Sequence, residues 1–344
     1  MNNIATSHRR STCLRTVLSH GATWLVLLFL LISCGGGFLL AGGGIGGTGI
    51  ISLGPITAFG SIFVNGVEYE LDGATILADG EPIDESGLRR GMVVRVEGEV
   101  KGDSTGTARA VAYSSTLSGP VGAQTPDSFT VLGQEIGITA TTRFHDFPAD
   151  RVETPPLRID DHVSISSVPN PDGSFSASAV IYRPPADQVK LNGFIVAFDP
   201  AMQTFRINTF VIDISQASLE NFGPNGPADG DFVRVEGQLV DSRVVEGQLE
   251  VLPPTLLAMQ VKNLQQTLAG EGERMAIEGI VEALDDWTIS LLTPEGRYLV
   301  SFNETTRFED GTPADLAQGV RIEINGTIFD NVFEADRIEV ENGD

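Results

Sequence analysis

The chain has 344 residues, 41% of them hydrophobic, and 46 acidic against 22 basic residues give it a formal charge of -24. A disordered acidic chain is excluded, because enough apolar residues are present to form several buried cores. Nucleic acid is not an expected partner, because so acidic a surface repels phosphate groups.

The first 33 residues differ from the rest of the chain. They contain three arginines and no acidic residue, and residues 24–32 form an apolar run. This run is too short to span a bilayer as a helix, so residues 1–33 are predicted to be a signal peptide. Without them, 19 basic and 46 acidic residues remain, a net charge of -27.

The end of this segment reads Leu31-Ile32-Ser33-Cys34. It resembles the lipobox of bacterial lipoproteins. The resemblance implies cleavage between Ser33 and Cys34 and attachment of lipid to Cys34, which would then anchor the protein in a membrane. An ordinary secretory signal that happens to contain Cys34 is the alternative. Gly35 is not the aspartate that retains many lipoproteins in the inner membrane, so the resemblance implies the outer membrane of a Gram-negative bacterium, with the periplasmic or surface face left open.

Residues 34–53 are predicted to be a flexible tether, because residues 35–49 contain nine glycines and no charge. Four similar units follow, each opening on a glycine and an alternating apolar pattern. The opening glycines are Gly54, Gly119, Gly193 and Gly279. The predicted domains are residues 54–116, 117–188, 189–262 and 263–344, and the last includes a linker.

Two strings recur within these units. Val94-Arg95-Val96-Glu97-Gly98 is repeated at residues 233–237, and Thr141-Thr142-Arg143-Phe144 is repeated at residues 305–308. The looser counterparts of the first string are at residues 162–165 and 321–324. The same order of motifs in successive units indicates duplication.

The hydrophobic pattern within a unit has a period of two, which is typical of strands. Asn65-Gly66 lies between two alternating runs and predicts a tight hairpin, and residues 294–296 predict another in the last unit. The alternation at residues 94–97 predicts that Val94 and Val96 face the core while Arg95 and Glu97 face solvent.

One helical turn is expected at residues 313–316, with Pro313 at its start and Gly319 as its stop. About six short strands and one turn in each unit predict an all-β fold of tandem small β-barrels, similar to oligonucleotide/oligosaccharide-binding (OB) barrels. Their relative packing is left open.

The first unit also carries a series of motifs made of turn glycines and core apolar residues. They are Gly54-Pro55-Ile56, Val64-Asn65-Gly66, Ala74-Thr75-Ile76, Gly91-Met92-Val93-Val94, Val96-Glu97-Gly98-Glu99-Val100 and Ala108-Arg109-Ala110-Val111. In this order they resemble domain of unknown function 5666, a bacterial domain found in tandem in predicted lipoproteins. The resemblance implies a fold and brings no catalytic residue with it.

Histidine stands near aspartate twice, in His145-Asp146 and in Asp160-Asp161-His162. We expect both histidines to be surface residues, because a nucleophilic site needs a Ser or Cys beside the His and the Gly-x-Ser-x-Gly motif is absent. Once residues 1–33 are removed, Cys34 is the only cysteine, which leaves no internal disulfide and no cysteine-based zinc site. We therefore expect no catalytic residue, no metal site and no cofactor.

Carboxylate pairs leave two alternatives open. The pairs are Asp84-Glu85, Asp285-Asp286 and Glu309-Asp310. A glycan hydrolase would need two carboxylates facing one cleft, and calcium would need several oxygen ligands in one loop. The Asp-Gly pairs at residues 79–80, 172–173, 229–230 and 310–311 are interpreted as turns.

Aromatic residues give one further hypothesis. Trp287, with Tyr69, Tyr113, Tyr182 and Tyr298, could provide a platform for a sugar or peptide, but strand aromatics are more often part of a core. The sequence thus favours a non-enzymatic, lipid-anchored binding or scaffold protein of the cell envelope, attached to the membrane through Cys34 and with a protein or glycan partner. The alternatives are an envelope glycan hydrolase and a calcium-dependent adhesion or assembly module.

Overall fold

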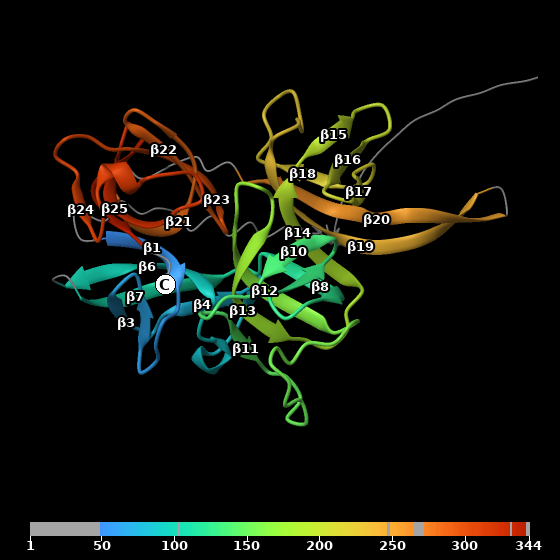
Figure 1. The fold of residues 1–344 in the computed structure, drawn as a ribbon, viewed down its shortest axis with the longest axis horizontal. Helices are drawn as coiled ribbons and strands as arrows, with labels where there is room; N and C mark the ends of the chain where they lie inside the picture. Colours follow the sequence, from blue (N-terminus) through green and yellow to red (C-terminus); the bar gives the residue numbers. More distant parts are fainter. Residues whose placement is uncertain (1–48, 102–103, 246–247, 265–271, 331, 342–344) are drawn as a thin grey trace, which may run out of the picture. The chain divides into compact units, whose positions relative to one another are not determined.

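A computed structural model describes residues 49–101, 104–245, 248–264, 272–330 and 332–341, without the side chains of residues 241–254 (Figure 1). This part of the chain is made of strands and turns, with two 3-10 turns, η1 (Glu85–Gly87) and η2 (Pro313–Asp315). The predicted all-β class is confirmed. Within these residues no helix is long and apolar enough to cross a membrane.

The strands fall into four sets in chain order. Repeat 1 contains β1 (Gly49–Pro55), β2 (Ile62–Val64), β3 (Val67–Glu70), β4 (Thr75–Ala78), β5 (Glu81–Pro82), β6 (Val93–Lys101) and β7 (Thr105–Tyr113). Repeat 2 contains β8 (Leu117–Gln124), β9 (Ser128–Val131), β10 (Gln134–Gly137), β11 (Arg143–His145), β12 (His162–Pro169) and β13 (Phe175–Tyr182). Repeat 3 contains β14 (Gln188–Phe194), β15 (Val196–Asp199), β16 (Thr204–Ile207), β17 (Phe210–Asp213), β18 (Ser218–Glu220), β19 (Phe232–Val245) and β20 (Gln248–Asn263). Repeat 4 contains β21 (Arg274–Asp285), β22 (Thr288–Thr293), β23 (Gly296–Ser301), β24 (Arg307–Glu309), β25 (Arg321–Phe329) and β26 (Val332–Val340).

Each repeat closes into a small barrel. In repeat 4 the pairing runs from β21 through β22, β23, β26 and β25 and back to β21. The short strand β24 follows β23 along the same edge of β26. Repeats 2 and 3 close in the same way, with β14 and β15 together serving as the first strand of repeat 3. The predicted tandem small barrels are confirmed, and closure leaves each barrel without a free edge in its own ring.

Repeat 1 closes less completely. Its strands β2, β3, β7, β6 and β1 pair in the same order as in the other repeats. Between β1 and β2 the link is made by two backbone hydrogen bonds, from the amide of Thr57 to the carbonyl of Phe63 (2.9 Å) and from the amide of Phe63 to the carbonyl of Ala58 (3.3 Å).

The opening glycine of each unit lies within its first strand, where the second strand or the hairpin turn comes very close. A Cβ atom on Gly193 would lie 2.3 Å from a side-chain carbon of Ile207, and one on Gly279 would lie 2.5 Å from the carbonyl oxygen of Leu292. Any side chain there would force the barrel open, which explains why glycine opens every unit.

The recurring Val-Arg-Val-Glu-Gly string forms the strand that leads into a β-bulge. The pairing register shifts between Glu97 and Gly98 in repeat 1 and between Glu236 and Gly237 in repeat 3. A Cβ atom on Gly237 would lie 2.1 Å from the carbonyl oxygen of Leu257. Repeats 2 and 4 have the shift at the same point, after Ser166 and Asn325. The glycine allows the last two strands to bend tightly around a small barrel.

The predicted local elements are confirmed. Asn65 and Gly66 both have positive φ, 49° and 71°, as a two-residue hairpin turn requires. The turn expected after residue 312 is η2, where the carboxylate of Asp315 accepts hydrogen bonds from the amide and hydroxyl of Thr312. The first strand begins at Gly49, five residues before the boundary expected from the opening glycine. Its apolar residues are buried because Ile50 packs in the core of repeat 1 while Ile51 and Leu53 pack in the core of repeat 4.

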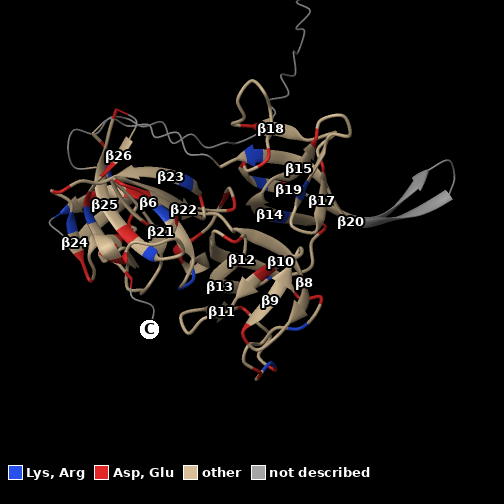
Figure 2. Ribbon diagram, turned by 45° about the horizontal axis from the view of Figure 1, so that its top comes forward, with Lys and Arg blue, Asp and Glu red and all other residues tan. Residues whose placement is uncertain are grey.

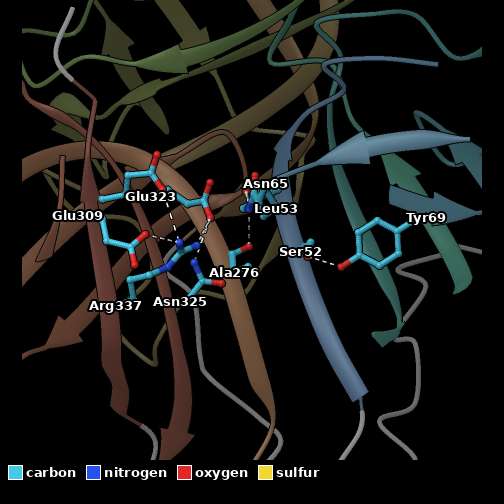
Figure 3. A network of polar contacts seen from close by, with 10 residues as sticks. Ser52, Leu53, Asn65, Tyr69, Ala276, Glu309, Glu323, Asn325 and Arg337 are labelled. Atoms are coloured by element: carbon cyan, nitrogen blue, oxygen red, sulfur yellow. Dashed lines mark hydrogen bonds and ion pairs between the residues drawn. The ribbon is translucent and has the colours of Figure 1, made fainter. Parts of the chain in front are cut away.

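The repeats associate in two pairs. Strand β1 of repeat 1 lies parallel to β21 of repeat 4, and β8 of repeat 2 lies antiparallel to β14 of repeat 3. Two 13-stranded sheets result, one from repeats 1 and 4 and the other from repeats 2 and 3. The side chain of Asn65 strengthens the first pair, because its Nδ2 donates to the carbonyls of Leu53 (3.2 Å) and Ala276 (2.8 Å) (Figure 3).

Candidate functional site

The residues predicted to carry lipid and to mark signal cleavage, Ser33 and Cys34, lie outside the described residues. The predicted signal peptide and most of the tether lie there too. These remain predictions from the sequence.

The two histidines do not form a site together. His145 Nε2 lies 2.7 Å from the carbonyl oxygen of Arg90, and its neighbour Asp146 forms an ion pair of 3.1 Å with Arg89. Both contacts join repeat 2 to repeat 1. They give His145 and Asp146 a role in packing the repeats together.

His162 is buried, so the expectation that it is a surface residue is wrong. Its side chain lies under the segment after β13, where Nδ1 accepts a hydrogen bond from the amide of Ala186 (3.0 Å). Burial lowers the pKa of His162, which keeps the ring neutral. The local sequence does not indicate the burial of His162, because Ala186 of the covering segment comes 24 residues later in the chain.

Asp161 is also structural. It receives two hydrogen bonds from the guanidinium of Arg151 and one from the amide of Arg158 (2.7 Å). Burial opposes ionisation of Asp161, but the Arg151 and Arg158 donors outweigh it and hold the pKa of the carboxyl below its usual value. The pair fixes the long connection between β11 and β12.

The prediction that Arg95 and Glu97 face solvent is wrong. Val94 and Val96 are fully buried in the core, as predicted, but the opposite face of β6 is covered by other repeats. Arg95 forms ion pairs with Glu97 (3.2 Å) and with Glu295 of repeat 4 (3.4 Å). A period of two correctly assigns residues to faces, but it does not say what covers the outer face.

The Asp79-Gly80 turn makes a similar contact between repeats 1 and 3. The carboxylate of Asp79 accepts hydrogen bonds from Lys190 Nζ (2.6 Å) and from the amide of Ser115 (2.8 Å). Burial opposes ionisation, but Lys190 and Ser115 outweigh it and lower the pKa of Asp79. Lys190 also pairs with Glu236 (3.4 Å). These charges stabilise the packing of repeats.

Several other carboxylates serve in turns or ion pairs. Asp172 accepts hydrogen bonds from Ser174, and Asp229 accepts one from the amide of Phe198 (2.8 Å). Glu309 pairs with Arg337 (2.6 Å), which also reaches Glu323 (Figure 3). Over the described residues, no group of three or more His, Cys, Asp or Glu side chains is placed to hold a metal ion.

Basic side chains are used in such pairs across the molecule (Figure 2). Those paired with carboxylates include Arg89, Arg95, Arg109, Arg151, Arg158, Lys190, Arg297, Arg321 and Arg337. The positive charge of these nine side chains is therefore balanced locally by carboxylates.

Three of the four predicted platform tyrosines are core residues, Tyr182 is half-buried, and Trp287 is exposed. Tyr69, Tyr113 and Tyr298 are buried, and burial raises the pKa of all three hydroxyls. Ser52 and Tyr69 share a buried hydrogen bond of 2.6 Å (Figure 3). Trp287 is 51% exposed at the tip of the turn between β21 and β22. The platform hypothesis is therefore wrong for these three tyrosines and still open for Trp287.

Trp287 lines a pocket of about 630 Å³ on repeat 4, which we call the Trp287 pocket. Its walls are residues 284–287, 302–304, 306, 308 and 313. The Trp287 and Phe302 ring centroids lie 5.5 Å apart, and those of Phe302 and Phe308 lie 6.2 Å apart, both within the range for aromatic pairs. The volume falls within the range of small-molecule sites.

Backbone and threonine hydrogen bonds fix this pocket. The amide of Phe302 donates to the carbonyl of Trp287 (3.0 Å), which ties the turn to the end of β23. In the recurring Thr-Thr-Arg-Phe string, Thr306 Oγ1 accepts from the amide of Asn303 (3.0 Å) and donates to the carbonyl of Ala335 (2.8 Å). The walls are therefore held in place before any ligand arrives.

Comparison with known proteins identifies the repeats. The family model of domain of unknown function 5666 (DUF5666) matches residues 49–112, 118–180 and 278–339, more than half of the chain. The chain belongs to the DUF5666 family. The three DUF5666 matches fall on repeats 1, 2 and 4, and the predicted family is confirmed. Repeat 3 shares the strand pairing and the bulge of the matched DUF5666 repeats.

Other comparisons add little to this DUF5666 assignment. Among proteins of curated function, none matches significantly. One solved structure with a match is a multidomain protein with nucleic acid binding domains from Streptococcus pneumoniae TIGR4, at 11% identity over 65% of this chain and 72% of that chain. Its TM-score is 0.16.

Proposed function

We propose that this protein is a lipid-anchored component of the cell envelope that binds a small ligand in the Trp287 pocket and catalyses no reaction. The observation that carries the proposal is the pocket itself, an open depression of ligand size with three aromatic rings in its lining. The half-exposed Trp287 offers a ligand an apolar ring with a polar N–H group.

Anchoring is supported by the lipobox at residues 31–34 and by the glycine-rich stretch behind it. Acyl chains on Cys34 would hold the chain at a membrane, in the outer membrane of a Gram-negative cell. The tether would let the repeats reach a ligand away from the bilayer surface.

A non-enzymatic role is supported by the structural contacts of the candidate catalytic side chains. Asp161, Asp79 and Glu309 are all engaged in ion pairs that hold the structure together. His162 is buried and hydrogen-bonded through Nδ1. The neutralised basic side chains likewise support a partner other than nucleic acid.

Anchoring is tested by replacing each cysteine in turn. Cys34→Ala is expected to abolish incorporation of labelled palmitate and to move the protein from the membrane to the soluble fraction. Cys13→Ala is the matched control and is expected to change neither. Continued acylation of Cys34→Ala would show that the anchor lies elsewhere.

Binding is tested by equilibrium dialysis of the full chain against a muramidase digest of cell wall. We expect retention of digest fragments by the wild type and at least a roughly tenfold loss with Trp287→Ala. Leu299→Ala is the control, because Leu299 is 55% exposed on β23 of the same repeat and outside the pocket. Chromatography of the fragments before and after incubation tests for catalysis, and shortened glycan chains would overturn the non-enzymatic proposal.

A further inference from the structure

The charged residues that line the Trp287 pocket are all acidic. Asp285, Asp286 and Glu304 contribute three carboxylates, and the lining contains no Lys, Arg or His. All three residues are exposed, so their charges lie on the solvent side of the pocket lining. Any ligand that enters is therefore surrounded by negative charge.

The aromatic floor favours the same kind of ligand. The face of an indole carries negative electrostatic potential and binds ammonium groups more strongly than the rings of Phe or Tyr. Trp287 lines the pocket and has half of its surface exposed, and Phe302 packs against it with ring centroids 5.5 Å apart. Both elements, ring face and carboxylates, attract a cation.

The described neighbours do not neutralise this charge. Asp285 accepts a hydrogen bond from the amide of Asp286 (2.9 Å), which orients the turn without adding a positive charge. The carboxylates also differ from a metal site, since the described residues contain no cluster of metal-ligating side chains. The occupant must supply its own apolar surface as well as its charge, because three rings line the cavity.

We infer that the Trp287 pocket binds a ligand that carries a primary ammonium group on a small or sugar-sized body. This inference rests on the proposed binding function and names its ligand class. The ammonium group would contact the Trp287 ring, and Asp286 and Glu304 would pair with it at the rim. A polyamine and an amino sugar both have this chemistry.

The experiment uses the intrinsic fluorescence of Trp287. The chain contains two tryptophans, Trp24 and Trp287, so Trp24→Phe in the full chain leaves Trp287 as the only reporter. Glucosamine, spermidine and N-acetylglucosamine are titrated separately at 50 mM salt. We expect saturable changes with glucosamine, with spermidine or with both, and none with N-acetylglucosamine, which has the sugar ring without the ammonium.

Two surface variants test the charge contribution. Asp286→Asn and Glu304→Gln are each expected to weaken binding of the ammonium probes roughly threefold, and 500 mM salt is expected to weaken it further. Glu334→Gln is the control, because Glu334 is an exposed carboxylate of the same repeat outside the pocket. Trp287→Ala, followed by equilibrium dialysis with labelled spermidine and glucosamine, is expected to weaken binding roughly tenfold.

The outcomes separate the inference from the proposed function. N-acetylglucosamine binding as tightly as glucosamine would overturn the ammonium inference and leave the binding function standing. No response to either ammonium probe would also overturn the inference, while retention of cell-wall fragments would still support the pocket. Equal affinity of wild type, Asp286→Asn and Glu304→Gln would overturn the role of the carboxylates and with it the choice of a cationic ligand.

Discussion

Repeats 2 and 4 hold the end of their third strands with the same hydrogen bonds. The amide of Ile138 donates to the carbonyl of Asp127 (2.8 Å), and the amide of Phe302 donates to the carbonyl of Trp287 (3.0 Å). The threonine bridges also match, from Thr142 to Ala177 (2.7 Å) and from Thr306 to Ala335 (2.8 Å).

The side chains on this shared frame differ. Repeat 2 has an aspartate and an isoleucine where repeat 4 has Trp287 and Phe302, which line the pocket. The comparison separates two kinds of residue. Threonines and glycines define the barrel in both repeats, whereas two aromatic side chains line a pocket in one of them.

The largest expected difference between repeats 2 and 4 lies in the connection that follows the shared hydrogen bonds. In repeat 2 the connection is held by the buried pair of Arg151 and Asp161, and in repeat 4 by the exposed Asp315 of η2. Asp161→Asn is expected to lower the free energy of unfolding by about 3 kcal/mol at pH 7, because Arg151 keeps a buried and uncompensated charge. Denaturant unfolding measures this, with Asp315→Asn as the control of much smaller effect.

The pH dependence of Asp161 follows from the sign of its shift. Its pKa is lower in the folded than in the unfolded chain, where it has its ordinary value. The stabilisation is therefore present above the unfolded pKa and is lost as the pH falls through the folded pKa. A wild-type advantage over Asp161→Asn that persists undiminished at pH 2 would contradict this role.

The threonine bridge is expected to matter equally in both repeats. Thr142→Val and Thr306→Val each remove a buried hydroxyl that bonds to one amide and one carbonyl. Each change is expected to cost about 2 kcal/mol, because two backbone groups lose their partner. Thr305→Val changes the neighbouring exposed threonine and is the control. If it costs as much as Thr306→Val, the bridge is not what holds the frame.

A smaller effect distinguishes the end of repeat 4. Burial and the nearby carboxylate of Glu278 raise the pKa of Glu341 to about 7, although Arg321 opposes them. Because the folded pKa lies above the unfolded one, this group stabilises the fold below the unfolded pKa, and the contribution is lost as the pH rises through 7. Glu341→Gln is expected to raise the free energy of unfolding by a few tenths of a kcal/mol at pH 8 and to leave it nearly unchanged at pH 4.

Thermal unfolding at both pH values measures this difference. Glu334→Gln removes an exposed carboxylate from β26, the strand that precedes Glu341, and is the control. An effect of Glu341→Gln that is the same at pH 4 and pH 8 would show that the glutamate is not destabilised by its neighbours.

Exchanging the distinguishing residues is also expected to change stability only slightly. Trp287→Asp and Asp127→Trp replace exposed side chains on equivalent turns, so each is expected to alter the free energy of unfolding by less than about 1 kcal/mol. Trp287→Asp is expected to abolish retention of cell-wall fragments all the same. A large loss of stability would mean that Trp287 belongs to the frame after all.

Much of each barrel was predictable because local signals determine it. Asn65-Gly66 fixes a turn through positive φ, and Pro313 begins the short helical turn, which ends at Asp315, before the predicted stop at Gly319. Val94 and Val96 were assigned to the core by their alternation. These are properties of neighbours in the chain, which a sequence displays directly.

What the sequence did not predict depends on distant residues. The outer face of β6 is covered by Glu295, and His162 is covered by the segment at Ala186. The sequence indicates one residue of the pocket, because Trp287 is the single tryptophan after residue 33. Its partner Phe302 carried no signal, because only the folded turn brings the two rings together.

The pairing of β1 with β21 bears on how the chain folds. Asn65 and the carbonyl of Ala276 that it contacts are 211 residues apart, so the first barrel receives its outer neighbour only after the last one has been synthesised. Contacts of such long range slow folding, and until then the edge of β1 can pair with another chain. A protein shortened at its C-terminus would therefore aggregate through its first strand.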